Sequence, residues 1–255
     1  MSLAQRFNQK GNVIILSETT DEPLTLAGQL CGICWGADTS NHEKNYKRGL
    51  DCLRSGHGRV LEFPQIYMKI SGYSARFIRE LYTHLAGSPT RLQASTRYVD
   101  YNDFDFIVPP KIEKNDEANN IYTDIMQNIG AAAQYMEKEL QIPREDAAMI
   151  LPLGMESTIV MRTNLRMMID MAKQRKCTRA YHEFRRFFQD FEDALKIYSD
   201  EWWYLIEEEH IFKAKCEYLH YCPEHYSCGK AINLETLERY IKEGKERDAS
   251  ISESS

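Results

Sequence analysis

The chain has 255 residues, of which 43% are hydrophobic and 27% are charged, and its formal net charge at pH 7 is −6. Such a composition is typical of a globular protein with a sizeable core, and the negative balance argues against a dedicated nucleic-acid binder. A few clustered arginines could still bind one small anion, because a local field can oppose the overall charge.

No apolar stretch is long enough to cross a membrane, which takes roughly eighteen or more consecutive residues. The N-terminal segment has only a short apolar run and no signal-peptide cleavage pattern, so we expect a cytoplasmic protein. The seven cysteines, an odd number, fit reduced thiols better than a framework of disulfides.

In the first half of the chain, the hydrophobic pattern changes between the period of a strand and that of a helix. Residues 65–71 alternate apolar and polar side chains, which predicts a half-buried strand that Gly72 ends. Ser74 is a suitable N-cap for the next helix. Together these patterns predict strands over 12–17 and 65–71, and helices over 25–36, 47–54 and 74–86.

The second half is predicted to be mostly helical. The acidic, Asn-rich stretch 113–120 is expected to be a surface loop, and Pro143 to start a short helix. Longer amphipathic helices are predicted over 121–140, 155–174 and 178–212, the last as one helix or two. The first of these has a stripe expected to face the core, formed by Ile121, Ile125, Ile129, Ala132, Met136 and Leu140.

No internal repeat and no convincing linker divides the chain. We therefore expect a single catalytic domain over residues 1–241. Residues 242–255 are too polar to bury any surface, and we expect them to be disordered.

The segment 79–101 is the most informative about function. It gathers a histidine, three arginines, several hydroxyls and Gln93 around a glycine-proline turn. Ser95, Thr96 and Arg97 offer hydroxyls, backbone N–H groups and a forked guanidinium, the donors that bind a phosphate well. The segment thus favours a phosphate or nucleotide site, with a polar turn of solvated arginines as the alternative.

Four ordered blocks of sequence resemble the flavin-dependent thymidylate synthases. His84 followed by Ser95-Thr96-Arg97-Tyr98 resembles their signature, which is Arg-His-Arg, seven residues, then Ser. Residues 56–62 (GHGRVLE), 151–166 (LPLGMESTIVMRTNLR) and 175–183 (RKCTRAYHE) resemble further family segments in the same order. The resemblance covers roughly residues 12–216.

This resemblance implies an α/β (α+β) fold of the thymidylate synthase-complementing type. Its central, mostly antiparallel sheet would have flanking helices and a helical C-terminal half. It also implies a homotetramer with shared sites, which converts dUMP to dTMP. Methylenetetrahydrofolate would donate the carbon, and NADPH would reduce the FAD cofactor. The family uses no protein nucleophile, so Arg175 and His84 would only support the reaction.

Site residues follow from the resemblance position by position. Those implied for dUMP are Glu80, Gln93, Ser95, Thr96, Arg97 and Arg175. Those implied for FAD are Cys34, His57, Arg59, His84, Arg91, Asn164, Arg166, Asp170 and Arg179.

The chain departs from the family signature around His84. Thr83 and Leu85 replace the two flanking arginines, and the gap to Ser95 is two residues longer. Arg79 or Arg91 could supply the lost charge. Similarly, Ala148 stands where a phosphate-contacting arginine is common, and Arg144 is a possible substitute. Two alternatives therefore remain: a relative on the same fold that modifies another pyrimidine nucleotide, and a nucleotide-binding protein without catalysis.

The cysteines suggest metal chemistry only weakly. Cys31-x-x-Cys34 lies in an apolar helical pattern without a second such pair, so packing is the favoured interpretation. A C-terminal cluster of Cys216, His220, Cys222 and Cys228 has no common zinc-finger spacing, so reduced thiols are favoured over a bound metal. A metal-binding interaction module is the weakest alternative function.

Overall fold

A computed structural model describes residues 6–7, 12–86 and 89–253. Its centre is a four-stranded sheet in which every neighbouring pair is antiparallel, which confirms the predicted sheet. The strands are, in spatial order, β2 (Asn12–Ile15), β3 (Gln65–Ser74), β6 (Glu156–Asn164) and β4 (Thr90–Gln93). A separate parallel pair joins β1 (Arg6–Phe7) to β5 (Phe106–Ile107).

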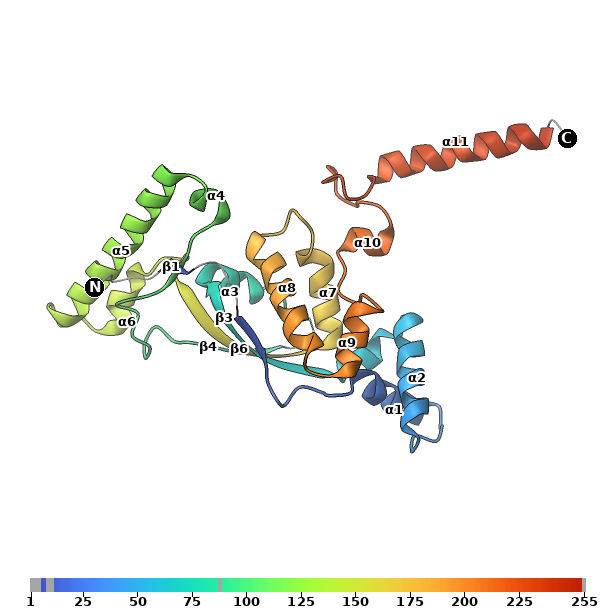
Figure 1. Ribbon diagram of the computed structural model, residues 1–255, viewed down its shortest axis with the longest axis horizontal. Helices are drawn as coiled ribbons and strands as arrows, with labels where there is room; N and C mark the ends of the chain where they lie inside the picture. The colour runs from blue at the N-terminus through green and yellow to red at the C-terminus, as the bar shows by residue number, and fades with distance from the viewer. Residues whose placement is uncertain (1–5, 8–11, 87–88, 254–255) are drawn as a thin grey trace.

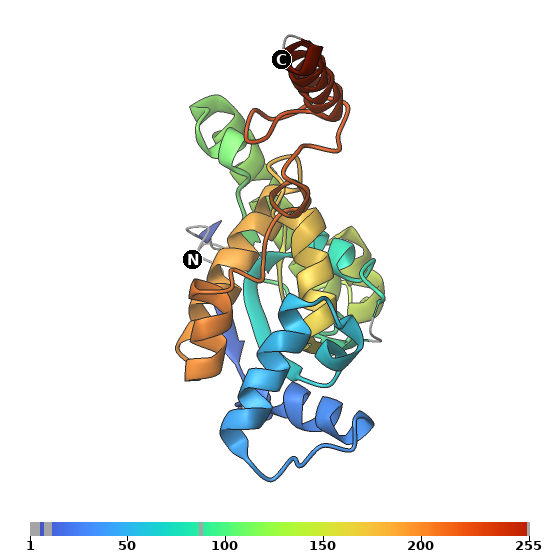
Figure 2. The ribbon, with the colours of Figure 1, turned by 90° about the vertical axis from the view of Figure 1, so that its right-hand side faces the viewer.

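One face of the sheet is covered and the other is bare in this chain. Helices α7 (Leu165–Arg175) and α8 (His182–Lys196) lie on the covered face (Figures 1 and 2). Buried methionines and isoleucines of β3 and β6 pair there, with Met68 opposite Met161 and Ile70 opposite Ile159. Alternating residues on the opposite face stay exposed, among them Ile14, Val160 and Leu92.

The central strand β6 corrects the sequence analysis, which predicted a helix throughout 155–174. Residues 156–164 pair with both β3 and β4, and only Leu165–Arg175 is helical. Ser157, Ile159, Met161 and Thr163 are buried at every second position, which is the strand period. The apolar residues of the strand and the following helix merged into one amphipathic pattern in the sequence.

Two boundaries around α3 (Ala75–Leu81) also differ from prediction. Gly72 does not end β3, because the strand continues to Ser74 past a shift in its pairing register with β6. Gly72 has a φ of 72° at this irregularity, a conformation that favours glycine. Ser74 caps the helix as predicted, accepting a hydrogen bond from the Phe77 N–H, but the helix ends at Leu81 instead of Ala86.

The first two helices pack at unusually close range. They are α1 (Pro23–Cys34) and α2 (His42–Arg54), both predicted from the sequence with later starts. A Cβ on Gly28 would lie 1.8 Å from the Asn45 carbonyl oxygen, so only glycine fits this contact. The pair leads into the 3₁₀ helix η1 (Gly58–Glu62), which contains Arg59 and has His57 as its N-cap, both predicted to contact flavin.

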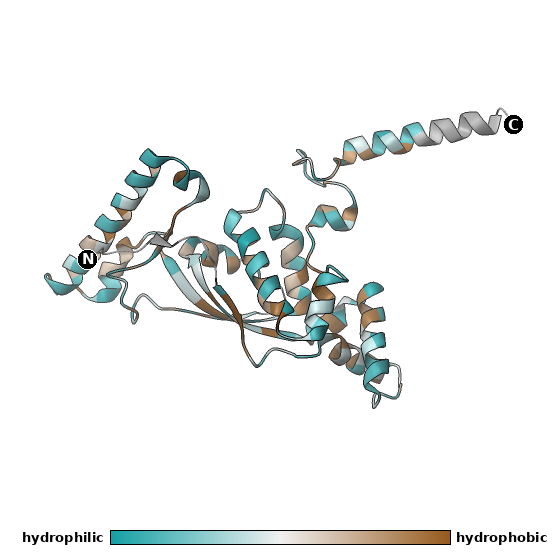
Figure 3. Cartoon of the chain, viewed as in Figure 1, coloured by the Kyte–Doolittle hydropathy of each residue, from teal (hydrophilic) through white to brown (hydrophobic). Residues whose placement is uncertain are grey.

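Helix α5 (Asp116–Lys138) forms an outer arm of the molecule (Figures 1 and 3). It starts within the stretch predicted to be a loop, where Asn115 accepts a hydrogen bond from the Ala118 N–H. The predicted core stripe is wrong at Ile121, Ile125 and Leu140, which are 54%, 52% and 53% exposed, and at the exposed Ala132. The arm instead buries a neighbouring face at Met126 against a small second core. Short helices adjoin it: α4 (Pro110–Glu113), α6 (Arg144–Ala147) and η2 (Ala148–Ile150).

The C-terminal part is helical but loosely arranged. Residues 178–212 form two helices, α8 and α9 (Asp200–Glu207), followed by α10 (Lys215–Leu219) and α11 (Leu234–Glu253). Helix α11 extends away from the rest (Figures 1 and 2), so the predicted disordered tail is helical as far as Glu253. Its sequence is rich in Glu, Lys and Arg, which are good helix formers. Among the described residues, no helix is both long and apolar enough to span a bilayer.

Candidate functional site

Three predicted site residues meet at the end of α7. The Arg175 Nε donates to His84 Nε2 at 2.9 Å, and its Nη1 donates to Glu80 Oε2 at 3.2 Å. The guanidinium carbon also lies 4.3 Å from the ring centroid of Phe184 on α8. Contacts on both sides therefore fix the orientation of Arg175, as a ligand-positioning group requires.

His84 is held as a neutral imidazole. Burial, and then the positive charges of Arg175 and Arg91, lower the pKa of His84 to about 4. Because a guanidinium can only donate, Nε2 of His84 is the acceptor, and the neutral ring carries its proton on Nδ1. His84 therefore offers one N–H donor and no charge at pH 7.

Arg91 approaches His84 from strand β4. Its Nη2 donates to the His84 carbonyl oxygen, and its guanidinium lies 5.2 Å from the centroid of the Tyr82 ring. Burial lowers the pKa of Arg91, and its buried Nε has no hydrogen-bond partner among the described residues. A buried donor without a partner is costly, so this one is available for a ligand. No arginine adjoins His84 in the sequence. The fold brings Arg91 to it from the stretch between His84 and Ser95, which is longer than in the family signature.

The outward face of α7 borders three neighbouring cavities. Asp170 contributes to one of about 540 Å³ and to another of about 270 Å³, and Lys173 contributes to the first and to a third of about 540 Å³. The first, which we call the η1 cavity, is lined by Leu53, Arg54, Gly56, Gly58, Leu61, Arg166, Ile169, Asp170, Lys173, Glu209, His210, Ile211, Lys213 and Tyr218. The second, the His84 cavity, is lined by Thr83, His84, Leu85, Ala86, Met167, Asp170, Met171 and Gln174.

The residues predicted to bind flavin are only partly gathered at the η1 cavity. Arg166 and Asp170 line it, and Arg59 is tied to Arg166 through Glu62, whose carboxylate pairs with both at 3.0 and 2.7 Å. His57 is exposed at the N-cap of η1. The sequence analysis did not single out Glu62, although this residue ends the block 56–62. The sequence feature that could have identified it is a carboxylate beside a histidine and an arginine.

Other predicted flavin contacts have different partners. Asn164 is 5% exposed and caps α7 by accepting the Met167 N–H at 2.9 Å, so it has a structural role. Arg179 pairs with Glu224 at 3.2 Å, and Cys34 is exposed at the end of α1. The contribution of Lys173, Lys213 and Tyr218 to the η1 cavity was missed, because no family block pointed to them.

The predicted phosphate residues lie at a different place. Arg97 pairs with Glu145 of α6 at 2.9 Å, and Ser95 Oγ accepts the Arg97 N–H at 3.2 Å. Gln93 donates to Ser157 Oγ at 3.1 Å. These contacts run along β6 and towards α6, whereas Arg175 contacts His84 and Glu80.

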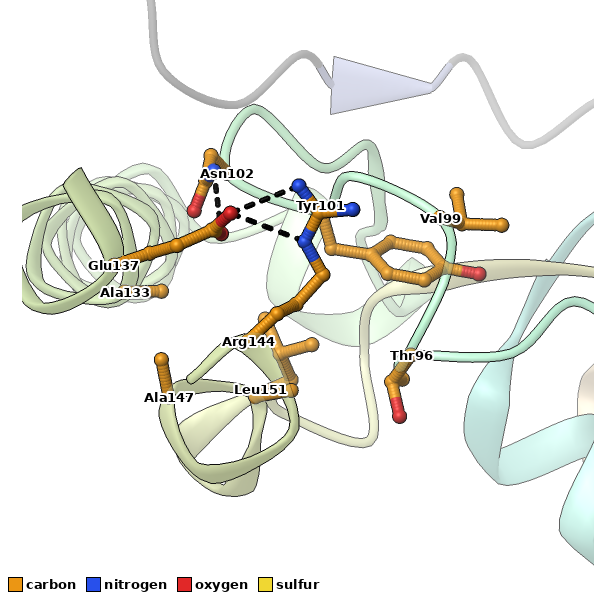
Figure 4. A pocket seen from close by; sticks show the side chains of 10 residues that line it. Thr96, Val99, Tyr101, Asn102, Ala133, Glu137, Arg144, Ala147 and Leu151 are labelled. Atoms are coloured by element: carbon orange, nitrogen blue, oxygen red, sulfur yellow. Dashed lines mark hydrogen bonds and ion pairs between the residues drawn. The ribbon is translucent and has the colours of Figure 1, made fainter. Parts of the chain in front are cut away.

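Thr96 borders a small cavity together with Arg144 and Ala148 (Figure 4). Arg144 thus lies near Ala148, as the substitution considered above requires. However, Arg144 already pairs with Glu137 at 2.8 Å and donates to the Tyr98 carbonyl oxygen at 3.0 Å. Hydrogen bonds from Arg144 and Asn102 lower the pKa of Glu137 to about 2.

The cysteines are arranged differently from either sequence pattern. All seven are free thiols, and Cys31 contacts Cys52, with 3.3 Å between their sulfurs, rather than Cys34. Across residues 6–7, 12–86 and 89–253, no three His, Cys, Asp or Glu side chains already converge as metal ligands do.

The described elements form a mixed α/β protein with an antiparallel sheet, and cationic and apolar side chains line the cavities beside α7. The chain belongs to the family described as "Thymidylate synthase complementing protein", whose sequence model matches residues 15–197.

Individual relatives agree with this assignment. A flavin-dependent thymidylate synthase of Nitratidesulfovibrio vulgaris is 32% identical over 187 residues, which is 70% of this chain and 73% of the relative. That of Clostridium tetani is 25% identical over 255 residues, covering 89% of this chain and 97% of the relative.

Solved structures show the same fold. The Helicobacter pylori flavin-dependent thymidylate synthase complexed with FAD and dUMP has a TM-score of 0.59 at 20% identity, covering 72% of this chain and 93% of that one. The UMP/dUMP methylase PolB from Streptomyces cacaoi, bound with 5-Br dUMP, has a TM-score of 0.65 at 16% identity, covering 79% and 96%.

Proposed function

We propose that the protein is a flavin-dependent thymidylate synthase, which converts dUMP to dTMP. Methylenetetrahydrofolate is the carbon donor, and NADPH reduces the FAD. The observation that carries this proposal is the contact of Arg175 with His84 and Glu80, beside the unpartnered N–H of Arg91. Family membership and the names of the relatives supply the reaction class.

Each member of this cluster has a role in binding or charge stabilisation. Arg175 is oriented by Glu80 and Phe184, and so can direct its N–H groups at a uracil carbonyl and stabilise negative charge on the ring. Neutral His84 contributes its Nδ1 hydrogen as a donor. No covalent nucleophile is needed, and Ser95 is assigned to the phosphate together with Thr96, Arg97 and Gln93.

The residues of the η1 cavity fit a flavin. A large, mostly planar cofactor with a phosphate-bearing tail needs apolar walls and cations together, and Leu61, Ile169 and Arg166 provide both. Arg59 lies on the adjoining helix η1, and His57 is at its N-cap. Bound FAD supplies the redox chemistry. The residues of the η1 cavity would hold it, and Asp170 lines both the η1 and the His84 cavities. Asn164, Cys34 and Arg179 remain proposed contacts of the same cofactor.

We propose that the complete site forms between subunits of a homotetramer. The phosphate residues and the Arg175 cluster make separate contacts within one chain, which supports sharing between chains. The bare sheet face also supports it, since Ile14, Val160 and Leu92 are 44%, 38% and 74% exposed. Exposed apolar surface of this kind marks interaction sites. A reducing, cytoplasmic location fits the seven free thiols.

One alternative substrate has a specific observation in its favour. The PolB neighbour is a UMP/dUMP methylase with a TM-score of 0.65. The loop after His84 departs from the family signature, so this chain could accept a different pyrimidine nucleotide, such as UMP. A nucleotide-binding protein without catalysis is the remaining alternative.

The first experiment is an absorption titration of the protein with FAD and then with dUMP. We expect a flavin spectrum that dUMP perturbs, because the two ligands share one site. Release of the C5 hydrogen is then measured for dUMP and for UMP, with methylenetetrahydrofolate and NADPH present. Faster release from dUMP supports the proposal. Release only from UMP supports the alternative substrate, binding of both ligands without release supports the non-catalytic alternative, and flavin that stays free at every concentration rejects the synthase.

A further inference from the structure

Four cysteines border one cavity at the end of α7. This cavity has a volume of about 540 Å³ and lies between the last turn of α7 and the segment 215–231. We call it the cysteine cavity, and its thiols are Cys177, Cys216, Cys222 and Cys228. Three of these residues follow the part of the chain that matches the family, which ends at residue 197.

Cys177 lies two residues after the end of α7, and the other three cysteines come from the segment 216–228. The four thiols are therefore arranged around the same space, although they come from distant parts of the sequence.

His220 belongs to the cluster in the sequence but not to the cavity. It ends α10 in the left-handed conformation, with a φ of 60°, and it is not among the described residues that line the cysteine cavity. The fold thus replaces the histidine of the sequence pattern with Cys177.

The remaining lining residues suit a negatively charged metal–thiolate centre. Four thiolates around a divalent cation carry a net charge of minus two, which a cavity wall must compensate. Lys173, Arg175, Arg179 and Lys215 line the cavity, and Glu224 is its acidic residue.

We propose that the cysteine cavity binds one Zn²⁺ through Cys177, Cys216, Cys222 and Cys228. Zinc prefers four tetrahedral ligands in structural sites and binds thiolates at about 2.3 Å. Each thiol loses one proton to the solvent, the four sulfurs bind the ion, and no electron is transferred. The proposal does not depend on the nucleotide that the enzyme uses.

Binding requires the sulfurs to move together, because no three of them yet converge in the described chain. We infer that the turn between Cys222 and Asn233 makes this movement. It is closed at its base by a bridge between these residues, in which the Cys222 N–H donates to the Ile232 carbonyl oxygen at 2.6 Å. Coupling of metal binding to local folding is usual in structural zinc sites. The ion would fasten this turn to α7, next to Arg175.

The test is the metal content of the full chain, purified with reductant and reconstituted with Zn²⁺. We expect one zinc per chain, and a thiolate-to-cobalt charge-transfer band when Co²⁺ replaces it. C177S and C228S should each weaken zinc binding by more than about 100-fold. The controls C34S and H220N should retain it, because neither residue borders the cavity. Circular dichroism checks that every variant is folded.

Two outcomes overturn the proposal. One is reduced wild-type protein that takes up neither zinc nor cobalt. The other is zinc that survives C177S but is lost in H220N, which would assign the ligands of the sequence cluster instead.

Discussion

Charged side chains in the covered core differ from those around the end of α7 in how fully the protein satisfies their hydrogen bonds. Glu183, in the first turn of α8, is fully buried, and its two oxygens accept from the Ser74 N–H and hydroxyl. Glu201 accepts from the Leu24 and Thr25 N–H groups at 2.6 and 3.1 Å and from the Thr25 hydroxyl. Each buried carboxylate therefore holds the start of another helix.

The cations around α7 are partly exposed and retain donors for a ligand. Arg91 has a buried Nε without a described partner, and Arg175 shares its contacts with a neutral histidine. A buried charge whose hydrogen bonds are all satisfied therefore belongs to the scaffold. A charge with spare hydrogen-bonding capacity beside a cavity belongs to the site.

The largest effect on stability is expected for Glu183→Ala. The change leaves the Ser74 N–H and hydroxyl buried without an acceptor, and it removes the carboxylate that Arg186 approaches at 3.5 Å. The free energy of unfolding should fall by about 3–5 kcal/mol, measured by urea denaturation. Glu208→Ala, at an exposed position, is the control. An equal, small loss in both variants would contradict a scaffold role for Glu183.

Arg175→Ala should have the largest effect on activity. Loss of the guanidinium removes charge stabilisation in the site, so kcat/KM should fall by about 10²–10³-fold. The free energy of unfolding should change by less than about 1 kcal/mol, since the residue is partly exposed. Arg239→Ala, on α11, is the matched control. If Arg175→Ala lost stability and kept its activity, Arg175 would belong to the scaffold and not to the site.

Arg91→Ala distinguishes the two candidates for the missing signature charge. Arg91 contacts His84 in the structure, so its loss should weaken flavin or nucleotide binding by about tenfold, as expected for one charge-assisted hydrogen bond. Arg79→Ala should change binding by less than about twofold. Both affinities are measured by flavin absorption or calorimetry. Unchanged binding of flavin and nucleotide in Arg91→Ala would contradict the assignment of Arg91 as the replacement for the missing signature charge.

The smallest effect is a pH dependence of stability from His84. Its pKa is about 6.5 in an unfolded chain and about 4 in the fold, so the unfolded chain binds more protons between these values. The contribution is complete above pH 6.5 and is lost as pH falls towards 4. After allowance for partial exposure it amounts to about 1 kcal/mol. Comparing unfolding of the wild type and His84→Asn at pH 7 and pH 5 measures it. Equal losses in the free energy of unfolding between pH 7 and pH 5 in both proteins would show that His84 is not the cause.

The sequence patterns predicted most elements, but they did not predict correctly which faces of these elements are buried. Ser74 as an N-cap and strand 65–71 depend on local patterns, and the structure has them. The exposed Ile121 and Ile125 were assigned to the core because periodicity identifies an apolar face but not the partner that covers it. Strand β6 was missed because strand pairing depends on residues far away along the chain.

For the site, the sequence by itself determined the family and the residue types. The match in four ordered blocks predicted Arg175, His84 and Glu80 as site residues, and the structure brings these three side chains into contact. Only the tertiary structure decided which residues act together. It brought Arg91 to His84, gave Asn164 a capping role, and replaced His220 with Cys177 beside the C-terminal thiols. The physical reason is that such contacts join residues separated by tens of positions, and chain folding rather than local spacing sets their distance.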